Sequence, residues 1–157
     1  MGMEIERKFL VSNDDWRPGA PGVIYRQGYL LAEGGLTVRV RRAGERGYLT
    51  IKGPAEGPAR PEFEYEIPAA DADAMLDGLV RGGVVDKIRY RRAYAGLLWE
   101  VDVFAGENAG LVVAEVELER VDQPVTLPGW AGEEVTDDAR YSNAALSRHP
   151  FRSWSRP

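Results

Sequence analysis

Charged side chains occupy every second position near the start of the sequence. In residues 3–11, Glu4, Glu6 and Lys8 alternate with apolar or other side chains such as Ile5. Successive side chains of a β-strand point to opposite faces, so two carboxylates and one ammonium would line one face of this segment. Carboxylate oxygens are ligands for Mg2+ and Mn2+, and a lysine ammonium can bind phosphate. The pattern fits either an ordinary solvent-exposed strand or one wall of a metal and phosphate site.

Five later segments repeat this alternation, and each carries mainly one sign of charge on one face. Acidic side chains recur in residues 62–67, 97–103 and 111–119, and basic side chains recur in residues 36–41 and 87–91. Adjacent carboxylates repel each other unless a cation lies among them or one of them is protonated. The sorting by sign therefore favours a binding site for ligands of both charges over a randomly solvated sheet face.

Short turns rich in glycine join most of these segments and predict about eight antiparallel strands. Apolar side chains at helical spacing predict one helix over residues 72–81, and a second is expected at about residues 137–147. If the sheet closes on itself, every charged face points into one lumen. We therefore expect a mainly β (α+β) protein: an eight-stranded antiparallel β-barrel tunnel with a charged lumen and a few covering helices.

The composition limits the other possibilities. The 157 residues suit a single domain spanning 1–157, and a net charge of -5 argues against a broad grip on nucleic acid. The sequence has no cysteine and one histidine, His149, so a thiolate or histidine metal centre is not expected. No apolar run approaches the roughly 20 residues of a membrane span. We expect a cytoplasmic protein with neither nucleic acid nor membrane as a partner.

The ordered series of charged pairs resembles the CYTH-domain or triphosphate tunnel metalloenzyme family. The signature of this family is an N-terminal Glu-x-Glu-x-Lys, which Glu4, Glu6 and Lys8 match, and the surrounding string resembles its short bacterial members. The agreement continues in order through Arg39 and Arg41, Lys52, Glu62 and Glu64, Lys87 and Arg89, Glu100 and Asp102, and Glu115 and Glu117. The resemblance implies an eight-stranded tunnel and divalent-metal-dependent chemistry on triphosphates.

The resemblance also implies a role for each charged residue. With Mg2+ or Mn2+ as the cofactor, the metal ligands would be Glu4, Glu6, Glu62, Glu64, Asp102, Glu115 and Glu117. The phosphate-binding residues would be Lys8, Arg39, Arg41, Lys52, Lys87 and Arg89. The catalytic residues would be Glu4, Glu6, Glu64 and Lys8, and either Glu4 or Glu64 would position the attacking water.

Several activities share such a tunnel. The expected reaction is hydrolysis of the terminal phosphoanhydride of inorganic tripolyphosphate. The alternatives within the family are a nucleoside or thiamine triphosphatase, acting on ATP or thiamine triphosphate, and a class IV adenylyl cyclase. A non-catalytic polyphosphate-binding module is the alternative of another class. The apolar strand faces would point outward, where a homodimer is one arrangement that would cover them.

Overall fold

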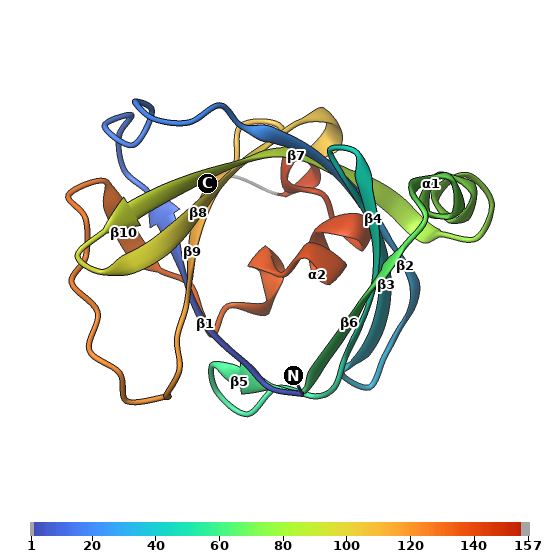
Figure 1. The fold of residues 1–157 in the computed structure, drawn as a ribbon, viewed down its shortest axis with the longest axis horizontal. Coiled ribbons are helices and arrows are strands. Elements are labelled where there is room, and N and C mark those ends of the chain that lie inside the picture. The colour runs from blue at the N-terminus through green and yellow to red at the C-terminus, as the bar shows by residue number, and fades with distance from the viewer. Residues whose placement is uncertain (1, 155–157) are drawn as a thin grey trace.

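One curled antiparallel sheet dominates the computed structural model, which describes residues 2–154 (Figure 1). Its strands in chain order are β1 (Glu4–Val11), β2 (Val23–Glu33), β3 (Leu36–Ala43), β4 (Arg46–Lys52), β5 (Ala59–Arg60), β6 (Glu62–Ile67), β7 (Arg81–Tyr94), β8 (Leu97–Phe104), β9 (Val112–Glu117) and β10 (Ala131–Glu134). The helices are α1 (Ala69–Gly78) and α2 (Asn143–Arg148), with 3-10 turns η1 (Gly106–Asn108), η2 (Ala139–Tyr141) and η3 (Phe151–Ser153).

The sheet curls until its ends approach each other. The hydrogen-bonded order is β10-β1-β9-β8-β7-β2-β3-β4-β6, with β5 paired to β1. At the seam between β1 and β6, the Glu6 N–H donates to the Pro58 carbonyl at 3.1 Å and the Glu62 N–H donates to the Gly2 carbonyl at 3.2 Å. The predicted mainly β antiparallel fold is confirmed. The eight strands expected from the sequence are present in one curled, barrel-like sheet, and the short strands β5 and β10 join them.

The register of the strands aligns the charged side chains in rows. Across β3, β4 and β6, Arg39 lies opposite Thr50 and Thr50 lies opposite Glu64. Across β1 and β9, Glu6 lies opposite Glu117. Cross-strand partners on one face lie close enough to interact, so the register creates contacts between residues far apart in the sequence. The β2–β3 turn supports this register, because Gly34 and Gly35 both adopt the positive φ of a tight hairpin.

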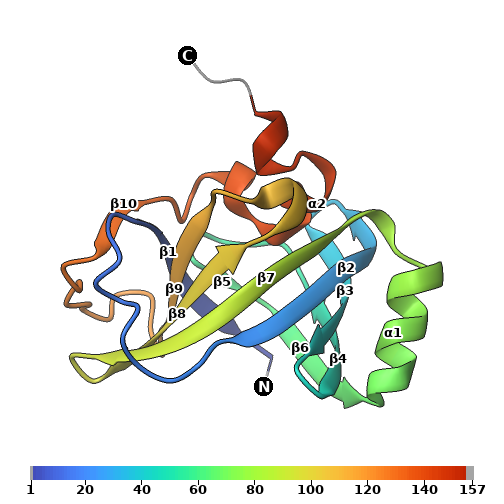
Figure 2. The same ribbon diagram turned by 90° about the horizontal axis from the view of Figure 1, so that it is seen from above.

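Apolar side chains from the outer face of the sheet pack under covering segments. Trp99 on β8 is fully buried, and its ring lies 5.5 Å from that of Phe9 and 5.6 Å from that of Trp130. On the opposite side, α1 covers the sheet through Ala72 and Leu76 (Figures 1 and 2). Two of the hydrophobic clusters therefore lie outside the curled sheet. A third lies inside, at the end that α2 covers, because Val85 and Phe104 share strand faces with Lys87 and Asp102. The rest of the interior is left to the charged residues.

Both helices differ from the sequence-based prediction. The helix predicted over 72–81 is α1, which begins earlier, at Ala69, and ends at Gly78. Residues 81–83, the predicted end of that helix and its glycine stop, belong to β7 instead. The helix predicted at about 137–147 is divided into η2 and α2. Ser142 is extended between them, and its hydroxyl accepts a hydrogen bond from the Ala145 N–H as the N-cap of α2. This segment lies across one end of the barrel (Figure 2). Within residues 2–154 neither helix is long and apolar enough to cross a membrane.

The Trp99 cluster gives a test of where the core lies. Trp99→Ala should lower the free energy of unfolding by about 3–5 kcal/mol, because the outer core loses its central ring. The adjacent Leu98 is half exposed on the opposite face, so Leu98→Ala should change stability by about 0.5 kcal/mol or less. Urea unfolding of both variants measures the difference. Equal effects would contradict an outward-facing core.

Candidate active site

The charged faces of the strands line an interior cavity of about 800 Å3. This volume suits a small-molecule ligand. The predicted site residues that line the cavity are Glu4, Glu6, Lys8, Arg39, Arg41, Lys52, Glu62, Glu64, Arg89, Glu115 and Glu117. Only Lys87 and Asp102, among the predicted site residues, lie outside its lining. The structure thus gathers most of the predicted residues around one cavity.

Carboxylates crowd the part of the cavity formed by β1 and β9. Burial, together with the nearby charges of Glu115 and Glu4, raises the pKa of Glu6 to about 8. Burial also raises the pKa of Glu117, and the charge of Glu4 adds to this effect. Such shifts arise where carboxylates are removed from water and neighbouring cations do not neutralise them fully. A divalent cation bound among these oxygens would relieve the repulsion.

Lys52 on β4 partly neutralises the negative charge of this carboxylate cluster. Its ammonium donates to both Glu4 oxygens, at 2.9 and 3.0 Å, and lies 3.5 Å from Glu62. Burial nevertheless raises the pKa of Glu4, and the attraction of Lys52 offsets only part of that effect. Glu4 therefore carries an internal counter-ion that a metal could replace.

Arg39, Thr50 and Glu64 form a connected row on the opposite wall. The Arg39 guanidinium donates to the Thr50 hydroxyl at 3.1 Å, and that hydroxyl donates to Glu64 at 2.7 Å. Among the described residues, the buried Arg39 Nε has no hydrogen-bond partner. A buried N–H without a partner is costly, so an acceptor that reached it would be bound favourably. This wall is suited to an anion.

Arg41 adds a cation that forms no ion pair with a carboxylate within the part of the chain that the structure describes. Burial, with repulsion from Arg39 and Arg89, lowers the pKa of Arg41 to about 9. Its guanidinium lies over the Tyr25 ring, 4.8 Å from the centroid, and its Nε donates to the Gln27 side-chain oxygen at 2.7 Å. A polyanion in the cavity would offset the repulsion among the three guanidinium groups, because charge-assisted contacts to phosphate are strong.

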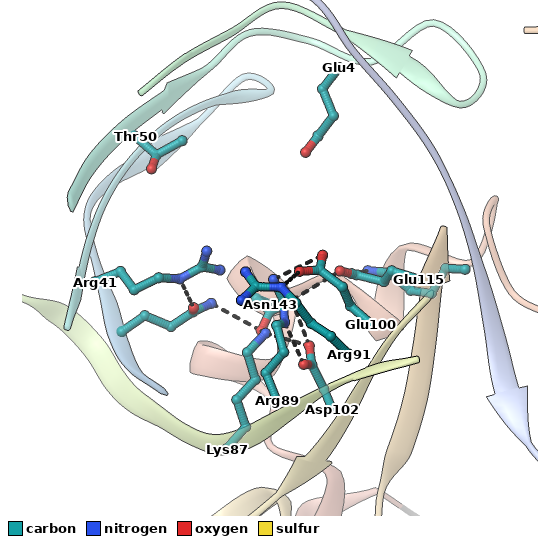
Figure 3. A network of polar contacts seen from close by, with 12 residues as sticks. Glu4, Arg41, Thr50, Lys87, Arg89, Arg91, Glu100, Asp102, Glu115 and Asn143 are labelled. Carbon is teal, nitrogen blue, oxygen red and sulfur yellow. Dashed lines mark hydrogen bonds and ion pairs between the residues drawn. The ribbon is translucent and has the colours of Figure 1, made fainter. Parts of the chain in front are cut away.

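Asp102 and Lys87 form a buried ion pair beneath the cavity (Figure 3). Asp102 accepts from Lys87 at 2.6 Å and from the Arg89 fork at 2.7 and 2.9 Å. Burial would raise the pKa of Asp102, but Arg89 and Lys87 hold it well below its usual range. Burial lowers the pKa of Lys87 to about 7. In the structure Asp102 thus positions Arg89, and Lys87 shares the same carboxylate. The predicted roles of Asp102 as a metal ligand and of Lys87 as a phosphate-binding residue stay predictions.

Arg89 connects this buried pair to the cavity. Its guanidinium also lies 3.1 Å from Glu115 and 3.3 Å from Glu100, and Glu115 lies 3.5 Å from Lys8. Glu100 lines the cavity although the predicted site omitted it. The sequence indicated this position, because Glu100 and Asp102 are two residues apart on β8 and therefore lie on the same face of the strand.

Neutral residues of the site carried a weaker sequence signal. Thr50 shares its strand face with Lys52, which hinted at an inward position. Gln27 and Asn143 are joined by a hydrogen bond of 3.0 Å, and Asn143 also accepts from Lys87 at 3.1 Å. Neither amide belongs to a charged pattern, so the sequence did not single them out.

The donor set matches, in kind, the divalent metal that the resemblance implies. Across residues 2–154, no three carboxylate or imidazole side chains already converge as a metal site. The cavity nevertheless offers the carboxylate oxygens of Glu6 and Glu117, whose pKa values are raised first by burial and then by neighbouring carboxylates. Mg2+ is commonly held by one or two carboxylates, waters and substrate phosphates. The residues therefore fit a hard cation that is bound together with a phosphorylated ligand.

The buried ion pair leads to a stability prediction. Asp102→Ala should lower the free energy of unfolding by about 3–5 kcal/mol, because it leaves Lys87 buried without its counter-ion. Asp86 on β7 is a matched control, since its ion pair with Arg26 is about half exposed. Asp86→Ala should cost about 1 kcal/mol or less. Denaturant unfolding tests both variants, and a small effect of Asp102→Ala would refute the positioning role.

The raised pKa of Glu6 leads to a pH-dependent prediction for the metal-free protein. The folded chain retains a proton on Glu6 that the unfolded chain releases near its ordinary pKa of about 4.3. Wild-type stability should therefore fall, relative to Glu6→Gln, as pH rises from about 5 through 8. In chelator at pH 9 the variant should melt at least about 2–4 °C higher, and at pH 5 the two should agree. The control Glu66→Gln, at an exposed position, should show no such divergence. A constant difference across pH would contradict the crowding of carboxylates.

Known proteins resemble this chain in sequence and in fold. A family model described as the CYTH domain matches residues 2–147. The chain is 46% identical over 154 residues to the inorganic triphosphatase of Acetivibrio thermocellus, covering 98% of this chain and 99% of that protein. It is 39% identical over 150 residues to the inorganic triphosphatase of Nitrosomonas europaea, covering 92% of this chain and 96% of that protein. A crystal structure of an inorganic triphosphatase matches with a TM-score of 0.66 and 37% identity, over 92% of this chain and 93% of that chain. The chain therefore belongs to the CYTH domain family.

Proposed function

We propose that this protein is a divalent-metal-dependent triphosphatase that hydrolyses the terminal phosphoanhydride of inorganic tripolyphosphate inside the cavity. The observation that carries the proposal is the cavity lining, which combines uncompensated carboxylates around Glu6 with guanidinium groups around Arg41. A polyanion carrying divalent cations has the complementary charges. The inorganic triphosphatases that resemble the chain over nearly its full length favour the same activity.

The basic residues would bind and orient the phosphate chain. Arg39 offers its unpartnered Nε, and Arg41 offers the part of its guanidinium that does not contact Gln27. Arg89 is held by Asp102, so it would enter the complex with little loss of side-chain freedom. Fixed cations near the transferring phosphoryl group would stabilise the charge of its oxygens in the transition state.

The acidic residues would serve the metal and the attacking water. Glu4, Glu6 and Glu117 are the proposed ligands of Mg2+ or Mn2+, with Glu62, Glu64 and Glu115 nearby. When bound, such an ion polarises phosphate oxygens and draws off developing negative charge. Glu4 and Glu64 remain the two proposed groups for positioning water, and they lie on different walls of the cavity. Lys8, which lies 3.5 Å from Glu115, would reach the phosphates from the acidic wall.

The chain would act as one domain on a small-molecule triphosphate in the cytoplasm. ATP and thiamine triphosphate are the competing substrates, because the cavity charges recognise the shared triphosphate rather than the organic group. An adenylyl cyclase would require the same binding residues with a different attacking group.

The decisive experiment compares substrates and metals on the purified protein. Tripolyphosphate, ATP and thiamine triphosphate are each incubated with Mg2+, Mn2+ or chelator, and released phosphate and cyclic AMP are measured. We expect metal-dependent phosphate release, fastest from tripolyphosphate. Glu6→Gln should reduce turnover by at least about a hundredfold, because it removes a proposed metal ligand, while circular dichroism shows a retained fold. Thermal stabilisation by tripolyphosphate without any product would instead identify a binding module.

A further inference from the structure

Two neutral side chains, the buried Gln27 and the partly buried Asn143, connect the C-terminal helix to the basic wall of the cavity. The Gln27 side-chain oxygen accepts from Arg41 Nε at 2.7 Å, and its amide nitrogen donates to the Asn143 oxygen at 3.0 Å. That same Asn143 oxygen accepts from Lys87 at 3.1 Å. The contacts form one continuous chain from Arg41 on β3, through Gln27 on β2, to the first residue of α2 and then to β7. Figure 3 shows Arg41, Asn143 and Lys87 in this network.

Chemistry fixes the orientation of both amides. Arginine and lysine side chains only donate hydrogen bonds, so an amide that meets each of them must present its oxygen. With the Gln27 oxygen toward Arg41, its nitrogen is left to face Asn143. The Asn143 oxygen then serves Gln27 and Lys87 together. Each member has one consistent arrangement, and none can rotate without leaving a buried group unpaired.

Arg41 depends on this network for its position. Among the described residues, the contact to Gln27 is the one hydrogen bond that the Arg41 side chain makes to the protein. Arg41 is buried and is repelled by Arg39 and Arg89, and these effects together lower its pKa. A long, flexible cation in such surroundings needs a fixed acceptor to remain directed at the cavity. Gln27 is fully buried and supplies that acceptor.

Helix α2 fixes the other end of the network. Ser142 caps its first turn, and Leu146 is buried against the cluster of Val85, Phe104 and Leu111. Asn143 is therefore held by the packing of the helix as well as by its hydrogen bonds. The docking of α2 across the end of the barrel and the position of Arg41 are thus physically connected.

We propose that Gln27 and Asn143 are positioning residues that direct Arg41 toward the bound phosphate chain and make triphosphate affinity depend on the docking of α2. The inference rests on the proposed function and assigns a new role to two neutral residues of that same site. Arg41 lies away from the crowded carboxylates of β1 and β9, so its contact with phosphate is expected to be equal in the ground state and the transition state. The network should then act on KM and leave kcat nearly unchanged.

A double-mutant cycle tests whether Gln27 acts through Arg41. Gln27→Met keeps the length of the side chain and removes both hydrogen bonds. It should raise KM for tripolyphosphate about tenfold, with kcat changed by about twofold or less. In an Arg41→Met background, the same substitution should change KM by only about twofold or less. The effects of substitutions within one hydrogen-bond network are not additive. Equal effects in both backgrounds, or a fall in kcat at unchanged KM, would overturn the proposal.

The helix end of the network is tested with a matched asparagine. Asn143→Leu should raise KM about as much as Gln27→Met, and the two changes together should be less than additive. Asn108 is the control, because it is buried and its side-chain oxygen accepts from the Phe151 N–H at 2.8 Å, which anchors the C-terminal segment at another point. Asn108→Leu should lower the melting temperature and leave KM within about twofold of wild type. A rise in KM for Asn108→Leu equal to that for Asn143→Leu would assign the effect to general loosening of the segment and refute the proposal.

A binding measurement separates this inference from the proposed function. Calorimetry of tripolyphosphate binding in chelator reports on the basic wall without turnover, and circular dichroism confirms the fold of each variant. If wild-type protein binds tripolyphosphate but hydrolyses nothing, the proposed function fails. The Gln27→Met and Arg41→Met double-mutant cycle is then measured as the affinity for tripolyphosphate instead of KM. If Gln27→Met and Asn143→Leu then bind as wild type does, the positioning role fails separately. If either variant does not fold, the other decides the outcome.

Discussion

The buried contact of Asp102 with Lys87 and Arg89 is the interaction on which the interior of this protein depends. Charges removed from water are costly unless they are paired in good geometry and their remaining hydrogen-bonding capacity is satisfied. Both Asp102 oxygens receive donors, and Arg89 contacts them as a fork. This contact connects β7 to β8 below the cavity and fixes the one guanidinium that also reaches Glu100 and Glu115. The direction of the arginine in the cavity follows from the buried aspartate beneath it.

Above this ion pair, the cavity lining carries an excess of negative charge on one side and an excess of positive charge on another. Burial and neighbouring carboxylates raise the pKa of Glu6, and burial and neighbouring guanidinium groups lower the pKa of Arg41. Both arrangements oppose folding, and the hydrophobic clusters outside the sheet and beneath α2 offset that cost. Separation of the two charge excesses by several strands prevents them from neutralising each other. Binding sites often retain such local strain, because its relief on binding contributes to affinity.

The sequence predicted these features unequally, for physical reasons. Strict alternation predicted which face of each strand carries charge, so most cavity residues were found from parity alone. Alternation along a strand could not show that Asp102 and Lys87 lie beneath the cavity lining. The depth of a side chain depends on the curvature of the sheet and on its neighbours. The broken C-terminal helix followed from one capping interaction at Ser142, which propensity over a longer window obscures. Gln27 and Asn143 act through a contact spanning 116 residues of sequence, which no local pattern encodes.

The ion pairs across the cavity explain how one lining can hold metal and phosphate together. Lys52 contacts Glu4, and Lys8 and Arg89 contact Glu115, so each acidic side chain is paired with a basic one. On the proposed function, a metal-bound triphosphate brings a partner for both members of each pair, since its oxygens replace the carboxylates and its cation replaces the ammonium groups. Either component alone would satisfy one member and leave the other buried without its partner. Affinity for the metal should therefore rise when triphosphate is bound, and thermodynamic linkage requires the reverse effect to be equal.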